Sequence, residues 1–256
     1  MARYAKSRGY IPIFYINSSP ENMYSDFEGD DIWGKFMNQL EDIKPEELLE
    51  SKNVYFSPNA NCLSILRHMY NEATPKDIKL EFKNGLYNEQ VEKYIEEHGR
   101  ILSEPENTLG VLIRGTDYQK TQFPGHPKHA TVEMMIAKIS EIEKTRPYKY
   151  IYLATEDAEV LEQMKAEYGD RLIYTDQERF VVEPGKLLAS VHGEKTKAEG
   201  KGFRLGAEYL CTLRLLSRCE SLLASGRCGG VTEAIKENGG KYRMKYVFDL
   251  GINPRV

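Results

Sequence analysis

An arginine, a hydroxyl and a carboxylate stand directly after an apolar segment in residues 110–118, Gly-Val-Leu-Ile-Arg-Gly-Thr-Asp-Tyr. The apolar part has the pattern of a buried strand, and parallel α/β sheets bind ligands just beyond the carboxyl ends of their strands. A guanidinium at that place offers a planar fork of donors that matches phosphate oxygens. Arg114 is therefore predicted to bind a phosphate group; the alternative is an ordinary ion pair at a strand end.

Two further segments place small or polar residues directly after an apolar run. Residues 154–157 are Ala-Thr-Glu-Asp, and residues 224–230 are Ala-Ser-Gly-Arg-Cys-Gly-Gly. In the second segment, backbone amides at a helix start would form an anion site, with Ser225, Gly226 and Arg227 as its residues. A plain turn with capping residues is the alternative there, and Thr155 and Asp157 alternatively begin a helix.

Candidates for a general base are Asp117 and His126. His126 lies in the loop after Arg114, although loop histidines are more often plain polar surface residues. Glu156 and Asp157 have no third metal ligand nearby in the sequence, so no metal site is predicted. The signatures GxGxxG, GxxxxGK[ST], HExxH and GxSxG are absent from the sequence, which argues against ordinary dinucleotide and P-loop chemistry.

The elements that position these residues follow from the hydrophobic periodicity of the second half. Strands are predicted at 109–113, 148–154, 171–174, 221–224 and 246–248, with helices at 131–144, 157–168, 205–218 and 229–237. Strands that alternate with helices of this length indicate βαβ units and a parallel sheet. The polar residues 176–202 are predicted to form a loop.

The first hundred residues are less regular. They predict a helix end at 3–9, strands at 10–16 and 54–56, a helix at 31–40, and helices within 76–101. Because the helix that closes on Gly9 has no beginning in the sequence, we expect a first strand and most of a first helix to be missing. We predict two lobes, residues 1–104 and 105–256.

Composition limits the class of protein. The net charge of −4 is spread over a chain that is 29% charged, so there is no basic field for nucleic acid. No apolar run reaches the roughly 18 residues that span a bilayer, and the start lacks the apolar segment of a signal peptide, so a cytoplasmic protein is expected. The four cysteines have neither CxxC spacing nor a disulfide framework, which predicts reduced thiols.

Three blocks in order resemble the C-terminal motifs of the α-1,6-fucosyltransferase and nodulation-fucosyltransferase superfamily. They are residues 110–118, residues 151–157 (Ile-Tyr-Leu-Ala-Thr-Glu-Asp) and residues 215–225 (Leu-Leu-Ser-Arg-Cys-Glu-Ser-Leu-Leu-Ala-Ser). The resemblance covers about residues 105–250, and within the superfamily the chain looks closest to bacterial proteins of surface polysaccharide and capsule loci.

The resemblance implies a GT-B-like α/β architecture, in which two Rossmann-like lobes with parallel sheets face each other. Residues 1–104 would then be an incomplete acceptor-side lobe, and residues 105–256 would hold a GDP-sugar without a metal or another cofactor. Arg114 falls on the first arginine of the family motif, which is expected to bind the donor diphosphate. Ser225 falls near a phosphate-binding serine, and Thr116 and Asp117 match the Thr-Asp that shapes the motif loop.

The chain also departs from the family pattern. Leu112 replaces a histidine, Gly115 replaces the second arginine, and Gln122 aligns roughly with an acidic residue. A carboxylate that reads guanine falls near Thr212. These departures leave the donor base and the catalytic base open.

The expected activity is transfer of a sugar, fucose-like, from a GDP-sugar to a glycan hydroxyl, with inversion, in surface polysaccharide biosynthesis. The expected partners are a nucleotide sugar and a glycan acceptor, with a peripheral association with the membrane. The predicted donor-binding residues are Arg114, Thr116, Thr155, Asp157, Thr212, Ser225, Gly226 and Arg227. The alternatives are a non-catalytic nucleotide-sugar or glycan binding protein and a transferase that uses a UDP-sugar.

Overall fold

The computed structural model describes residues 2–18, 22–54, 75, 77–183, 185, 186, 188 and 200–255. Contacts divide the chain into two compact units: Met1–Ser19 with Phe27–Gln90, and Pro20–Asp26 with Val91–Val256. The predicted lobes place residues 20–26 and 91–104 in the first lobe, whereas in the structure these residues belong to the second unit. Helix α4 (Glu89–His98) buries the side chains of Val91 and Ile95, and Asp26 accepts a hydrogen bond from the backbone N–H of Gly202, which links both segments to the second unit.

The first unit is built from short elements, α1 (Ala2–Ser7), α2 (Ile32–Phe36) and the 3₁₀ helix η1 (Pro45–Glu50). Asp31 caps α2 by accepting a hydrogen bond from the backbone of Trp33. The rings of Phe14 and Trp33 stack at 4.3 Å, and Phe82 lies 6.3 Å from Trp33. Stacked aromatic rings therefore contribute to the packing of this unit.

The strand predicted at 10–16 is wrong. Gln39 binds both backbone groups of Phe14, and Asp31 accepts from the backbone N–H of Ile16. Side chains thus satisfy groups that a neighbouring strand would otherwise bind. Among the described residues of this unit there is no strand of a sheet. Of the strand predicted at 54–56, residues 55 and 56 lie outside the described residues.

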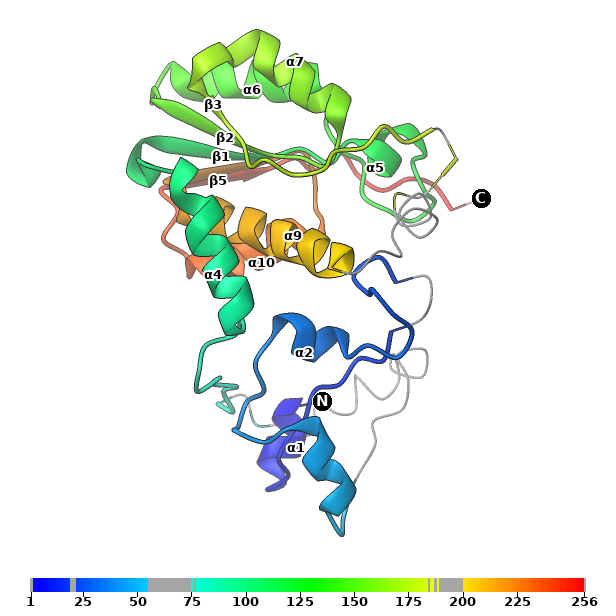
Figure 1. Cartoon of the computed structure of the whole chain (residues 1–256). Coiled ribbons are helices and arrows are strands. Elements are labelled where there is room, and N and C mark those ends of the chain that lie inside the picture. The colour runs from blue at the N-terminus through cyan, green and yellow to red at the C-terminus, as the bar shows by residue number, and fades with distance from the viewer. Residues whose placement is uncertain are drawn as a thin grey trace. The chain divides into compact units, whose positions relative to one another are not determined.

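A five-stranded parallel sheet forms the centre of the second unit (Figure 1), in the order β3-β2-β1-β4-β5. The strands are β1 (Thr108–Leu112), β2 (Tyr150–Ala154), β3 (Leu172–Ile173), β4 (Ser221–Ala224) and β5 (Met244–Val247). This order matches the first five strands of a Rossmann fold. The predicted parallel sheet is confirmed.

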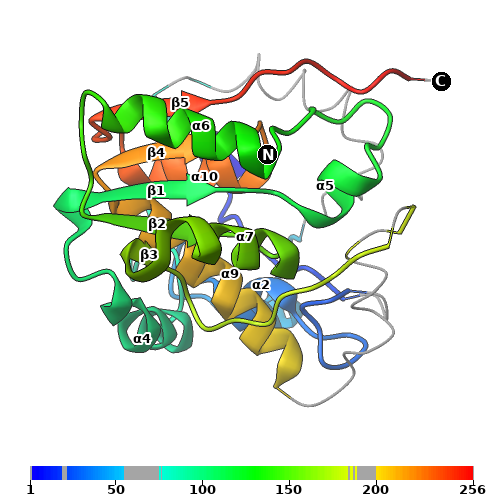
Figure 2. The ribbon, with the colours of Figure 1, turned by 90° about the horizontal axis from the view of Figure 1, so that it is seen from above.

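Helices cover both faces of this sheet (Figure 1). Helices α6 (Val132–Glu143) and α7 (Ala158–Tyr168) lie on one face, and α9 (Lys201–Arg218) and α10 (Gly229–Asn238) lie on the other with α4. The remaining elements are α5 (Thr116–Lys120), η3 (Gly99–Ile101), η4 (Pro105–Asn107) and η5 (Gly169–Arg171). Figure 2 shows α5 beyond the carboxyl end of β1. The layers are therefore helix, sheet and helix.

The sheet is buried on both faces, as parallel sheets are. All five residues of β1 and all four of β4 are buried. Between the sheet and helices α6 and α7, apolar side chains pack into one cluster, including the fully buried Met135, Ile139 and Met164. This core fixes the strand ends and hence the residues that follow them.

Candidate functional site

The order of the sheet reverses between β1 and β4, and the residues that follow these two strands are joined by a hydrogen bond. Arg114 lies two residues beyond β1, and Ser225 follows β4 directly. The backbone N–H of Arg114 donates to Ser225 Oγ over 3.1 Å. In open α/β sheets this reversal point is where ligands bind.

His129 completes this junction, because its Nδ1 lies 2.9 Å from Ser225 Oγ. Ser225 Oγ accepts from the backbone N–H of Arg114, and its hydroxyl hydrogen can donate to Nδ1 of a neutral ring. Burial, with a smaller contribution from the charge of Arg114, lowers the pKa of His129 to about 4. His129 is therefore neutral at pH 7.

The turn after Arg114 is held by the start of α7. The backbone N–H of Thr116 donates to Asp157 Oδ2 over 2.7 Å, and Asp157 Oδ1 accepts from the backbone of Glu159 and Val160. Asp157 thus caps α7 and anchors the turn at once. A Cβ added at Gly115 would lie 2.5 Å from atoms of Asp157, so the close approach requires glycine.

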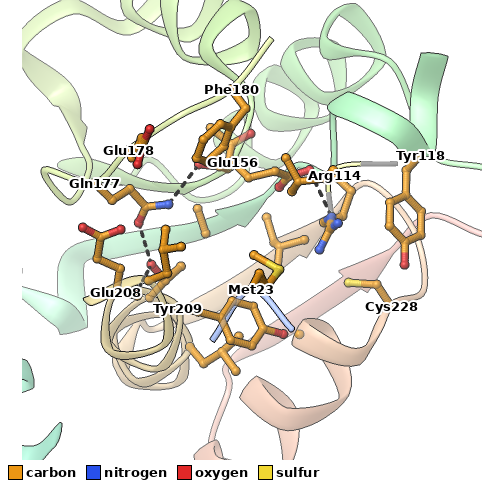
Figure 3. A pocket seen from close by; sticks show the side chains of 18 of the residues that line it. Met23, Arg114, Tyr118, Glu156, Gln177, Glu178, Phe180, Glu208, Tyr209 and Cys228 are labelled. Atoms are coloured by element: carbon orange, nitrogen blue, oxygen red, sulfur yellow. Dashed lines mark hydrogen bonds and ion pairs between the residues drawn. The ribbon is translucent and has the colours of Figure 1, made fainter. Parts of the chain in front are cut away.

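A cavity of about 330 Å³ opens beside this turn, lined by residues of the second unit (Figure 3). Arg114, Tyr118 and Cys228 lie at one end, and Gln177 and Glu208 lie at the other. The first end presents a cation and the second presents an amide and a carboxylate. The cavity therefore suits a ligand with an anionic part and a polar part.

The guanidinium of Arg114 is held from two sides. Its Nε lies 3.1 Å from Glu156 Oε1, which also accepts a hydrogen bond from Thr116 Oγ1 over 2.9 Å. Its Cζ lies 4.4 Å from the ring centroid of Tyr118, within the range of a cation–π interaction. The side chain of Arg114 is 22% exposed, so it is fixed in the cavity wall and remains accessible to a ligand.

The N-terminus of α10 also faces the cavity. Cys228 is the N-cap residue and lines the cavity together with Gly230. Burial raises the pKa of the Cys228 thiol, while the backbone amides of Val231 and Gly230 and the charge of Arg114 act against that rise. These same groups would stabilise a ligand anion at this place.

Glu208 and Thr212 lie one turn apart on α9 at the other end of the cavity. Glu208 is 5% exposed, and its Oε1 accepts from Arg204 Nε over 2.8 Å. Thr212 Oγ1 lies 2.9 Å from both Gln177 Oε1 and the backbone oxygen of Glu208. Polar groups from α9 and from the segment after β3 therefore meet here.

Tyr24 lines the cavity from the short segment 20–26. Burial raises the pKa of Tyr24, and the positive charge of Arg114 opposes that rise. The phenol is thus neutral at pH 7 and lies close enough to Arg114 to interact electrostatically with it.

Only some of the predicted site residues line the cavity. Arg114, Thr155 and Thr212 do. Thr116, Asp157, Ser225 and Gly226 are buried behind them, where Asp157 and Ser225 hold the backbone of the turn. Arg227 is exposed and pairs with Asp249 at 2.8 Å, and His126 is exposed. Asp117 lies in α5, and its side chain is outside what the structure describes.

Sequence reasoning did not assign Gln177, Glu208, Tyr24 or Tyr118 to the site. Gln177 falls in the predicted loop 176–202, and Tyr24 falls between predicted elements, 90 residues before Arg114 in the chain. The available signal was Glu208, because it is a carboxylate one helical turn before Thr212, on the same face of a helix whose neighbouring residues are apolar.

No group of acidic, histidine or cysteine side chains suited to a metal ion occurs among the described residues. In the same part of the chain, no helix has the length and apolar character needed to cross a bilayer.

The fold and the cavity at its reversal point define a GT-B-like α/β class of protein, and comparison with solved structures identifies particular neighbours. A fucosyltransferase NodZ from Bradyrhizobium matches with a TM-score of 0.59 and 15% identity, over 99% of this chain and 89% of that chain. A NodZ α-1,6-fucosyltransferase co-crystallised with GDP matches with a TM-score of 0.55 and 14% identity, over 91% and 83%. No family model and no curated protein sequence matches the chain.

These matches confirm the predicted α/β, GT-B-like fold and the resemblance to nodulation fucosyltransferases at the level of the fold. At this identity the likeness carries the fold alone.

Proposed function

We propose that this chain is a glycosyltransferase that moves a sugar, fucose in the simplest case, from a GDP-sugar to a hydroxyl of a glycan. Support comes from the shared fold with fucosyltransferases, one of which was crystallised with GDP. The same proposal includes inversion at the sugar carbon, no requirement for a metal ion, and a cytoplasmic role in surface polysaccharide biosynthesis at the membrane periphery.

The observation that carries the proposal is Arg114 in the cavity wall beside the N-terminus of α10. When the bond between sugar and diphosphate breaks, the leaving GDP gains negative charge. Fixed donors aimed at that charge lower the barrier. Arg114 and the backbone amides that follow Cys228 would supply such donors without a metal ion.

The general base is the part of the mechanism with the least support. Asp117 and His126 stay the candidates, since both follow Arg114 closely in the sequence. His126 is exposed, so it reaches a substrate only if the acceptor binds near the surface of the loop. General base assistance is typically worth about 10²- to 10⁴-fold in rate.

Arg114→Ala tests the proposal. Loss of one donor to a developing anion costs roughly 3 kcal/mol, about 10²-fold or more in rate. We expect release of GDP from GDP-fucose, measured with an acceptor mixture of surface glycans, to fall at least 100-fold while the circular dichroism spectrum is unchanged. Arg243→Ala is the matched control, because Arg243 pairs with Glu220 at the start of β5 and lies outside the cavity lining. Equal turnover in both variants would contradict the proposal.

A second candidate function is a non-catalytic nucleotide-sugar or glycan binding protein, favoured by Gly115 and Gln122 at positions where the family motif is charged. Calorimetry with GDP beside the GDP-release assay separates the two functions. Binding without release favours the second candidate, and binding with release favours the transferase.

A further inference from the structure

The two ends of Arg114 are held by side chains that both contact His129. At the backbone end, the N–H of Arg114 donates to Ser225 Oγ over 3.1 Å, and His129 Nδ1 lies 2.9 Å from the same oxygen. At the guanidinium end, Cζ lies 4.4 Å from the ring centroid of Tyr118, and Figure 3 shows these two side chains next to each other. The rings of Tyr118 and His129 lie 4.9 Å apart at 67°, an edge-to-face contact. These four residues therefore form a closed chain of contacts.

His129 is itself fixed by its surroundings. A Cβ added at Gly226 would lie 2.9 Å from Cγ of His129, so the imidazole rests directly on the backbone of that glycine. The N–H of Ala130 donates to the backbone oxygen of Ser225 over 2.7 Å. Gln119 Nε2 donates to the backbone oxygen of Ala130 over 2.9 Å, which ties helix α5 to the same segment. The imidazole is thus a rigid support for the groups that it contacts.

His129 acts through its neighbours and does not itself reach a ligand. Among the described residues, the lining of the cavity includes Arg114 and Tyr118 but not His129, which is 9% exposed. Burial and then the charge of Arg114 lower the pKa of His129, so the ring carries no charge at pH 7. A charged imidazole at this place would repel the guanidinium, whereas a neutral ring leaves the full attraction of Arg114 for an anion.

We infer that His129 is a positioning residue that orients Arg114 toward the diphosphate of the sugar donor; this inference rests on the proposed function. Through Ser225 it fixes the point at which the arginine leaves the strand, and through Tyr118 it fixes the plane of the guanidinium. A guanidinium matches two phosphate oxygens only in its own plane. Loss of the support should therefore weaken diphosphate binding although the charge of Arg114 is still present.

Calorimetry of the full chain with GDP tests this role in a double-mutant cycle. His129→Asn keeps an acceptor for the hydroxyl of Ser225 but removes the ring that Tyr118 contacts. We expect the Kd for GDP to rise about fivefold in the wild-type chain. In a chain that already carries Tyr118→Leu, the same substitution should raise the Kd less than about twofold, because the ring that His129 supports is then gone. A merely structural role of His129 would weaken GDP binding by the same factor in both backgrounds.

Two further variants complete the experiment. His129→Ala removes the contact with Ser225 as well, so GDP should bind at least about tenfold more weakly, and His129→Asn should recover part of that loss. If thermal melts show that the alanine variant does not fold, the cycle with His129→Asn decides alone. His98→Asn is the matched control, because His98 stacks on Tyr94 at 3.8 Å in helix α4 and lies outside the cavity lining. This substitution should leave the Kd for GDP unchanged.

The outcomes separate this role from the proposed function. If His129→Asn weakens GDP binding equally in both backgrounds, or leaves it unchanged in the wild-type chain, the positioning role is wrong while the transferase proposal stands. If the two substitutions are coupled but GDP-fucose is not turned over, the positioning role stands and the second candidate function is favoured. If the wild-type chain does not bind GDP, both proposals fail.

Discussion

Arg114 carries its own counter-ion before any ligand arrives. Glu156 holds Nε at 3.1 Å, and Tyr118 stacks against the guanidinium. A diphosphate that binds here replaces none of the hydrogen bonds of Ser225 or Asp157, but it brings negative charge close to Glu156. Binding is therefore a balance between attraction to Arg114 and repulsion from its partner.

Glu156→Gln should strengthen the binding of GDP. The amide keeps an oxygen to accept from Thr116 Oγ1 but has no negative charge. For a partly exposed pair we expect about 0.5 to 1 kcal/mol, which is roughly a two- to fivefold lower Kd by calorimetry. Weaker binding would show instead that the Glu156 charge is needed to pose Arg114. The gain should shrink as salt concentration rises, since salt screens the repulsion.

Arg114 was predictable because its signal is local: an apolar strand followed at once by a cation. Gln177 was not, because the groups that orient it are Thr175 nearby and Thr212, 35 residues further along the chain. Ser225 was placed correctly after its strand, but burial gives it contacts with Arg114 and His129 and no exposed surface. Whether a side chain faces a ligand depends on packing that the sequence does not display.

Helices α6 and α7 both begin with a side-chain cap, but only one of the two caps also binds backbone outside its helix. Thr131 accepts from the backbone of Met134 and serves α6 alone. Asp157 serves α7 and also holds the backbone of Thr116 in the turn after Arg114. Removing the two caps should therefore have different consequences.

Thr131→Ala and Asp157→Ala should both lower the midpoint of thermal unfolding, because an N-cap contributes about 1 kcal/mol. Only Asp157→Ala should also weaken GDP binding, because it removes the hydrogen bond that holds the backbone of the turn after Arg114. Thermal melts and GDP calorimetry on both variants check this. Equal GDP affinities would mean that the turn keeps its shape without Asp157.

Buried strands of the second unit were predicted well, and the first unit was not. Residues 221–224 match β4 because four apolar or small residues stand between two polar segments. The pattern at 10–16 is just as apolar, yet Tyr10 and Ile11 are about half exposed. A strand needs a neighbouring strand to bind its backbone, and here the side chains of Gln39 and Asp31 bind the backbone instead.

Helix α9 begins at Lys201, before the predicted residue 205. The backbone N–H of Gly202 donates to Asp26, which is distant in the sequence, and this contact accounts for the earlier start.

Stability of the whole molecule should depend on the buried imidazole of His129. Its pKa is about 4 in the folded chain against 6.5 for an ordinary histidine, because burial and then Arg114 disfavour the charged ring. Between these two values the unfolded chain binds a proton that the folded chain excludes. The contribution of His129 to the free energy of unfolding is therefore fully present above pH 6.5 and is lost as the pH falls toward 4.

His129→Asn should reduce this pH dependence. Asparagine keeps an acceptor for the hydroxyl of Ser225 but does not titrate. We expect the midpoint of thermal unfolding to fall more steeply between pH 7 and pH 5 in the wild-type chain than in the variant. Parallel curves would show that His129 is not the responsible group, because the other titrating groups are common to both proteins.

The contact at Gly115 limits how this protein can change. A second arginine at that position would bring its first side-chain carbon within 2.5 Å of Asp157. No single codon change can therefore add a second cation there without displacing the aspartate that starts α7. A doubly charged turn would therefore require a compensating change at Asp157 as well.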